Sequence, residues 1–210
     1  MRIGLWIVLG AMLGADGSQP ARLTESPVRI ALPPVHVQCQ AAFDVGVDPS
    51  GLVTEMSCLY GSAPLTNGLE EVVAQWYFEP ATEDGVPKPS HVLVAALFRP
   101  PALFNVGPCG PPDAMILAPP DLPVPIVVRP PTYPVHALGR GVVIVEVGIG
   151  PSGEVRSARA LGGPTAFDRA AEQAAQAWRF LPGCRQGRPV PTVAYLVFGF
   201  QEPALSAGRD

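Results

Sequence analysis

The chain has 210 residues, of which 48% are hydrophobic and 15% charged, so it can form the core of one domain or of two small ones. Its formal net charge of −4 at pH 7 excludes the usual route to nucleic-acid binding, in which many Lys and Arg side chains displace counterions from the phosphates. The 27 prolines are concentrated in the stretches 31–34, 100–134 and 182–191, where they indicate boundaries between folded parts.

The first residues have the pattern of an export signal. Arg2 precedes an uncharged, mainly apolar run from Ile3 to Ala15, and Ala15-Asp16-Gly17 places small residues where a signal peptidase reads them. The run is shorter than the roughly 20 apolar residues that span a bilayer. The sequence therefore predicts a signal peptide over residues 1–17 and a periplasmic protein. The alternative is an uncleaved anchor, which would hold the chain in the inner membrane, facing the periplasm.

The main feature of the chain is an internal repeat, in which an offset of 102 residues places Val45 on Val147. Without any gap, the same offset superposes Pro49-Ser50-Gly51 on Pro151-Ser152-Gly153, Trp76 on Trp178, and Phe98 on Phe200. A match of this length predicts two tandem copies of one module. We place them at residues 35–100 and 130–202, joined by a Pro-rich linker over 101–129 that acts as a semi-rigid spacer.

Each copy predicts the same elements in the same order. In the second copy, 142–149 is apolar like a buried strand, Pro151-Ser152-Gly153 has the residues of a turn, and 154–161 is the returning strand of a hairpin. A helix with one apolar face then follows, and 192–200 is a third strand. The apolar face comprises Phe167, Ala171, Ala174 and Trp178, and in the first copy Leu65, Leu69, Val72 and Trp76.

The four cysteines, Cys39, Cys58, Cys109 and Cys184, fit an oxidising compartment and form no CxxC motif. A turn centred on Pro49-Ser50 places Cys39 and Cys58 on facing strands, two residues from register. We therefore favour a disulfide between these two, with free buried thiols as the alternative.

Catalytic and metal-binding motifs are not convincing in this sequence. Residues 148–153 match the GxGxxG pattern, but a dinucleotide site requires a helix directly after it, and a strand follows here. His36, His91 and His136 are too far apart for a typical metal site. The serines lack the setting of a nucleophile elbow. We therefore expect no enzymatic activity, no cofactor and no metal.

The second copy resembles the C-terminal domain of TonB-family energy transducers. The resemblance depends on an ordered set of motifs: Tyr133-Pro134, Gly141, Pro151-Ser152-Gly153, Phe167-Asp168, Trp178-Arg179-Phe180 with Pro182, Gly187-Arg188-Pro189-Val190 and Phe198-Gly199-Phe200. The first copy resembles the same domain in a degenerate form that lacks the Tyr-Pro opening. For each copy the resemblance implies an α+β fold, with a three-stranded antiparallel sheet and one or two helices on one face.

The resemblance also implies a function. The family domain works in the periplasm, where it adds a segment of an outer-membrane TonB-dependent receptor as a strand to its sheet and transmits force from an inner-membrane motor. Such strand addition uses the unpaired N–H and C=O groups of an edge strand. We expect that edge to be 192–200, with Val193, Tyr195, Val197 and Gly199 beside the peptide. Exposed edges also predict homodimers.

Two departures from a typical transducer keep a second function open. The apolar run Ile3 to Ala15 is short and lacks the His that couples family anchors to the motor. The Pro-rich segment lies between the copies and contains one basic residue, Arg129. The chain is therefore expected to support outer-membrane transport through its second copy, or to serve as a periplasmic two-module protein-binding scaffold without energy coupling.

Overall fold

The computed structural model describes residues 17–25, 39–61, 65–98 and 118–201. The predicted signal segment, except Gly17, and residues 101–117 of the predicted linker lie outside the described residues, as does Cys109.

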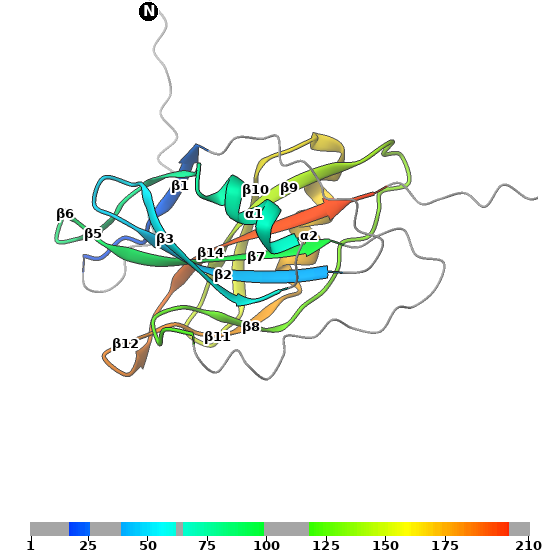
Figure 1. The fold of residues 1–210 in the computed structure, drawn as a ribbon. Coiled ribbons are helices and arrows are strands. Elements are labelled where there is room, and N and C mark those ends of the chain that lie inside the picture. The colour runs from blue at the N-terminus through cyan, green and yellow to red at the C-terminus, as the bar shows by residue number, and fades with distance from the viewer. Residues whose placement is uncertain (1–16, 26–38, 62–64, 99–117, 202–210) are drawn as a thin grey trace, which may run out of the picture.

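Six long strands form a single sheet in the order β10-β9-β14-β7-β2-β3 (Figure 1). β10, β9 and β14 are antiparallel to one another, and so are β7, β2 and β3. The two sets meet where β14 runs parallel to β7. The strands are β2 (Cys39–Val47), β3 (Val53–Tyr60), β7 (Ser90–Phe98), β9 (Gly141–Ile149), β10 (Val155–Gly162) and β14 (Thr192–Phe200). The expected three-stranded sets are therefore parts of one sheet.

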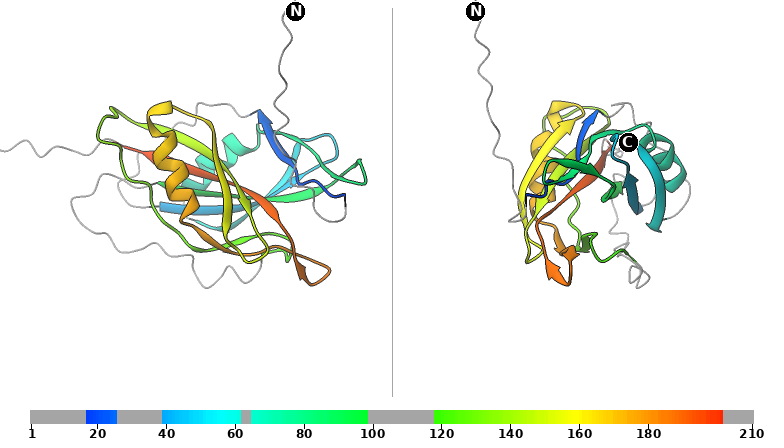
Figure 2. Two further views of the ribbon diagram at one scale, coloured as in Figure 1. Left: turned by 180° about the vertical axis from the view of Figure 1, so that it is seen from behind. Right: turned by 90° about the vertical axis from the view of Figure 1, so that its left-hand side faces the viewer.

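One helix packs on each face of this sheet (Figure 2). α1 (Leu65–Val73) follows the hairpin β2–β3, and α2 (Asp168–Gln176) follows the hairpin β9–β10 after the short helix η2 (Thr165–Phe167). The opposite placement follows from the parallel junction. The strand order of the second half, β10-β9-β14, is mirrored in β7-β2-β3, while β14 and β7 point the same way. A half-turn about the strand direction therefore relates the two halves, and such a rotation exchanges the faces of the sheet.

Two hydrophobic cores result, one on each face, because alternate residues of a strand point to opposite sides. Val143, Val145 and Val147 face the core under α2, whereas Val142 and Ile144 face the core under α1. The predicted helix faces are buried in these cores, with Val72 only partly covered. Burial on both sides explains why β9 and β14 are apolar over nearly their whole length.

Short strands outside the central sheet repeat the same spacing. β1 (Arg22–Glu25) pairs with β4 (Tyr77–Glu79), and β8 (Val124–Val127) pairs with β11 (Arg179–Leu181). Two hairpins also recur: β5 (Ala81–Glu83) with β6 (Val86–Lys88), and β12 (Cys184–Arg185) with β13 (Arg188–Pro189). β8 lies within the predicted linker and β1 precedes the predicted first copy, so both boundaries need extension toward the N-terminus.

Candidate functional site at the strand edges

Strand β14, where we predicted the peptide-binding residues, is not an edge. It pairs with β9 on one side and with β7 on the other, where Tyr195 is opposite Val94, Val197 is opposite Ala96, and Gly199 is opposite Phe98. Its backbone groups are therefore engaged on both sides. The prediction that Val193, Tyr195, Val197 and Gly199 line a free edge is wrong for this structure.

The same four positions instead join the two halves of the sheet. The buried ring of Tyr195 lies edge-on to Trp76 and Phe78, with ring centroids 6.1 and 5.7 Å away. Val197 is buried in the core under α1, and Val193 packs against it. A Cβ on Gly199 would lie 2.3 Å from the Phe98 ring. Burial raises the pKa of the Tyr195 hydroxyl, with the Glu146 charge adding to the effect.

A polar cluster beside Tyr195 ties the N-terminal strand to the second half. The Tyr195 hydroxyl accepts a hydrogen bond of 2.7 Å from the Leu23 N–H and lies 3.3 Å from Glu146 Oε2. Glu146 is buried, and its Oε1 lies 3.2 Å from Arg22 Nη1 and 3.3 Å from Arg159 Nη2. A buried carboxylate with these partners is well compensated, and removing one partner is costly.

A second buried carboxylate, Asp44, pairs with His91 across β2 and β7 at 2.8 Å. Glu55 lies 4.0 Å from the other ring nitrogen of His91. Burial lowers the pKa of His91, but the hydrogen bond and charge of Asp44, with the charges of Asp121 and Glu55, raise it above its ordinary value of 6.5. The charged imidazole is thus favoured in the folded state.

This pair predicts a pH-dependent stability difference between the native chain and a His91→Gln variant. Because the folded pKa is raised, the contribution of the charged His91 is fully present below about pH 6.5 and is lost as pH rises through the higher folded value. We expect a difference of less than about 1 kcal/mol, since solvent reaches the His91 side chain, which is 36% exposed, and screens its charge. Urea unfolding at about pH 5.5 and about pH 8.5 measures it. An equal difference at both pH values would contradict the assignment.

In the part of the chain that the structure describes, the free edges of the sheet are β3 and β10, the two outer strands. On β10, the Ala160 N–H points outward and donates a hydrogen bond of 2.9 Å to Glu172 Oε1 on α2. On β3, the residue 102 positions earlier is Cys58, with an exposed side chain and a free thiol. Partial desolvation by the surrounding residues, and then the charge of Glu70, raise the pKa of this thiol.

The disulfide predicted between Cys39 and Cys58 is not formed. Cys58 is opposite Phe43, not opposite Cys39. At about 3.3 Å per residue along a strand, this register separates the two cysteines by roughly 13 Å, whereas a disulfide needs Cα atoms within about 7 Å. Cys184 is also free, and the side chain of Cys39 lies outside the described ones.

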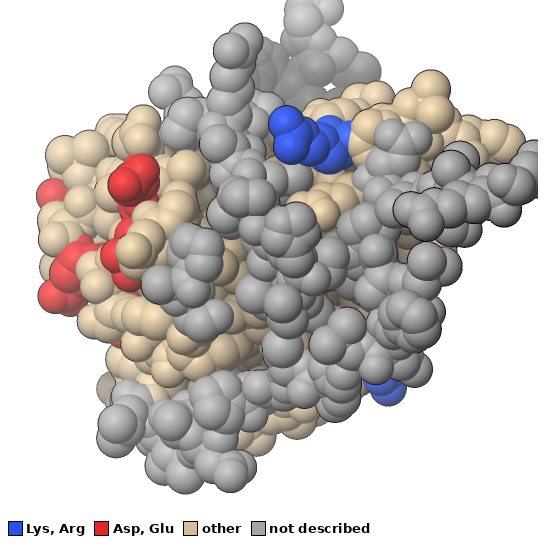
Figure 3. Space-filling model, turned by 45° about the vertical axis from the view of Figure 1, so that its right-hand side comes forward, with Lys and Arg blue, Asp and Glu red and all other residues tan. Residues whose placement is uncertain are grey.

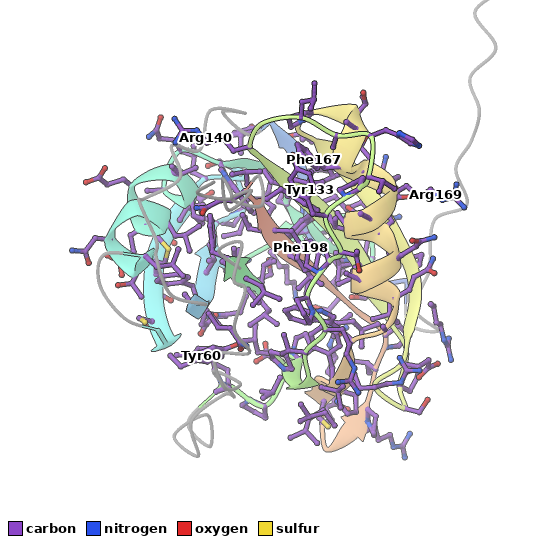
Figure 4. All side chains as sticks on the ribbon, turned by 90° about the vertical axis from the view of Figure 1, so that its right-hand side faces the viewer. Tyr60, Tyr133, Arg140, Phe167, Arg169 and Phe198 are labelled. Atoms are coloured by element: carbon purple, nitrogen blue, oxygen red, sulfur yellow. The ribbon has the colours of Figure 1, made fainter. Side chains whose placement is uncertain are left out.

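The motif residues of the second half form an aromatic cluster at one end of α2 (Figure 4). The Tyr133 ring lies edge-on to Phe167 at 5.6 Å, and Phe167 stacks on Phe200 at 4.5 Å. The Tyr133 hydroxyl donates to the Gly139 carbonyl at 2.8 Å. The conspicuous Tyr-Pro motif thus serves to close the loop that leads into β9.

The indole of Trp178 helps to hold the segment just after β8 against the second half of the structure. Its Nε1–H donates a hydrogen bond of 2.9 Å to the carbonyl of Arg129, just after β8. The ring is buried and lies edge-on to Phe198 at 5.8 Å. Sequence reasoning missed this contact because a backbone acceptor carries no sequence signal.

Within the described ranges, no group of three His, Cys, Asp or Glu side chains could hold a metal ion. In those same ranges, none of the helices is long and apolar enough to cross a membrane.

Comparison with known proteins identifies the second half. Residues 129–201 match the family described as the Gram-negative bacterial TonB protein C-terminal domain, which covers β9, β10, α2 and β14. No curated protein matches the chain. The family is transport-related and non-enzymatic, and its members face the periplasm and interact with outer-membrane receptors. Residues 129–201 of this chain are therefore a TonB C-terminal domain.

Proposed function

We propose that the chain is an exported periplasmic scaffold of two TonB C-terminal-like modules. It binds an extended segment of a protein partner by strand addition at an outer edge of its sheet, in support of transport across the outer membrane. An outer-membrane receptor is the first candidate partner. The two halves do not couple energy to that receptor directly.

The observation that carries this proposal is the pairing of β14 with β7. If this chain bound a receptor segment in the way expected from its resemblance to energy transducers, strand addition would need a free edge on β14, the last strand of the domain. Here the first half supplies the neighbouring strand, and the side chains of β7 belong to both cores. A receptor segment could reach β14 only by separating the halves.

The recurrence of elements supports the proposal that both halves descend from one module. The order hairpin, helix, strand occurs as β2-β3-α1-β7 and again as β9-β10-α2-β14. The pairs β1–β4 and β8–β11 keep the same offset of 102 residues, since Leu23 is opposite Phe78 and Pro125 is opposite Phe180. Because Leu23 and Pro125 are not identical, these pairings extend the repeat beyond the sequence identities that first indicated it.

Hydrogen exchange on the full chain tests this function. Peptides from the periplasm-facing segments of outer-membrane receptors are added, and backbone protection is measured by mass spectrometry. We expect new protection on β3 or β10, where backbone groups have no second strand, and unchanged exchange on β7 and β14. Faster exchange on β7 together with new protection of β14 would show displacement of the first half. That result would favour the energy-transducer function over the scaffold.

A further inference from the structure

The two outer edges of the sheet differ in whether a helix side chain already occupies them. On β10, Glu172 from α2 accepts the outward N–H of Ala160. On β3, the corresponding residues are Cys58 and Glu70, and the described residues include no hydrogen bond between them. An added strand needs such outward groups to form its ladder. Among the described residues, β3 is therefore the more open edge.

The edges also differ in charge. Residues 53–75, which form β3 and α1, contain three Glu and no Lys or Arg. The equivalent residues 155–177, which form β10 and α2, contain three Arg, one Asp and one Glu. Figure 3 shows acidic side chains gathered on one side of the face in view, apart from the basic ones. A charged segment approaching the sheet is thus attracted to one edge and repelled from the other.

The carboxylates near the β3 edge lie on both faces of the sheet. The side chain of Glu55 lies on the face of Asp44 and His91 and is 69% exposed. Glu70 lies on the opposite face, because α1 covers that side and its charge acts on Cys58. Side chains of an added strand point alternately to the two faces. On each face, these side chains would therefore lie near a carboxylate.

We propose that β3 is the edge that accepts the partner strand, and that the partner segment is rich in Lys or Arg. This inference rests on the proposed function and specifies its site and ligand class. The backbone of β3 supplies the ladder, and Glu55 and Glu70 select positive side chains. A second copy of the chain is a poorer occupant, since its basic strand β10 has its outward Ala160 N–H already bound by Glu172.

The test uses the full chain and a short synthetic peptide of lysine, threonine and valine, with a matched peptide in which glutamate replaces lysine. Amide chemical shifts measured by NMR locate binding. We expect the lysine peptide to shift the amides of β3 and to bind more weakly at high salt, because salt screens exposed charges. The glutamate peptide should not bind. Equal binding of both peptides, or shifts confined to β10, would overturn the inference.

Charge reversal provides a matched pair of variants. The double variant Glu55→Lys/Glu70→Lys is expected to weaken the lysine peptide about tenfold or more. The control Glu79→Lys/Glu83→Lys makes the same change in net charge near the β5–β6 hairpin and should stay within about twofold. If both variants weaken binding equally, only net charge matters and the β3 site is wrong.

Backbone variants test strand addition itself. Cys58→Pro removes the outward N–H and should abolish binding, while Cys58→Ser keeps that N–H and should retain it. Thermal unfolding checks that each variant folds. If Cys58→Pro does not fold, the charge-reversal pair still tests whether the peptide binds at β3. Sedimentation must show a monomer before peptide is added; a dimer dissolved by Cys58→Pro would assign β3 to a second copy instead. If receptor peptides protect β10 alone, this inference fails and the proposed function stands.

Discussion

A fragment of residues 118–202, which keeps β8 with its half but is cut from the rest of the chain, is expected not to fold as a stable monomer. Its strand β14 would become an edge, and Val142, Ile144, Tyr195 and Val197 would lose the cover of α1 and β7. Exposing a large buried apolar side chain costs about 1.5–3 kcal/mol. Four of them cost roughly 6 kcal/mol or more, which is comparable to the whole stability of a typical domain.

Circular dichroism, urea unfolding and gel filtration of this fragment measure the effect. The control is the complementary half, residues 17–117, added in trans: it should restore a soluble one-to-one complex with cooperative unfolding. A fragment that is monomeric and unfolds cooperatively by itself would contradict the shared-core description. It would also show that β14 can be a free edge in a stably folded domain.

Gly153→Ala is expected to destabilise the protein by about 3 kcal/mol, against about 1 kcal/mol for Gly187→Ala. Both glycines have positive φ, +81° and +74°. A Cβ at Gly153 would lie 1.8 Å from the Phe180 carbonyl oxygen, whereas a Cβ at Gly187 would meet nothing within 4 Å. The difference thus isolates the close backbone approach from the cost of positive φ.

The first half contains an equivalent site that provides an internal check. Gly51 accepts a hydrogen bond of 2.8 Å from the Phe78 N–H, just as Gly153 accepts one of 2.9 Å from the Phe180 N–H. A Cβ at Gly51 would lie 1.9 Å from the Phe78 carbonyl oxygen. Gly51→Ala should therefore cost about as much as Gly153→Ala in urea unfolding. Similar costs for Gly153→Ala and Gly187→Ala would show that the turn can relax.

Much of the local structure could be predicted from sequence because it depends on short-range chemistry. The turns at Gly51 and Gly153 need residues that tolerate positive φ, and the helix faces need apolar side chains three and four positions apart. The short strands β1 and β8 escaped prediction for a physical reason. Each has four residues, with Leu23 in one and Pro125 in the other, and each is held by a strand distant in sequence.

The candidate site was misplaced because the apolar strand β14 was treated as an edge. Thr192–Phe200 contains no charged residue, whereas the true edges carry Glu55 on β3 and Arg156 and Arg159 on β10. Edge strands commonly carry charges, which discourage unwanted pairing. That contrast was present in the sequence and, if weighed, would have indicated an interior position for β14.

The sequence by itself determined the repeated order of hairpin, helix and strand, and the resemblance of the second half to the TonB C-terminal domain. Only the tertiary structure decided that the two halves share one sheet, that their helices lie on opposite faces, and that β7 occupies the side of β14 where a peptide was expected. The reason is that backbone pairing between strands uses the same N–H and C=O groups in every residue. Such pairing leaves little trace in the side chains, so the choice of neighbour depends on the packing of the whole chain.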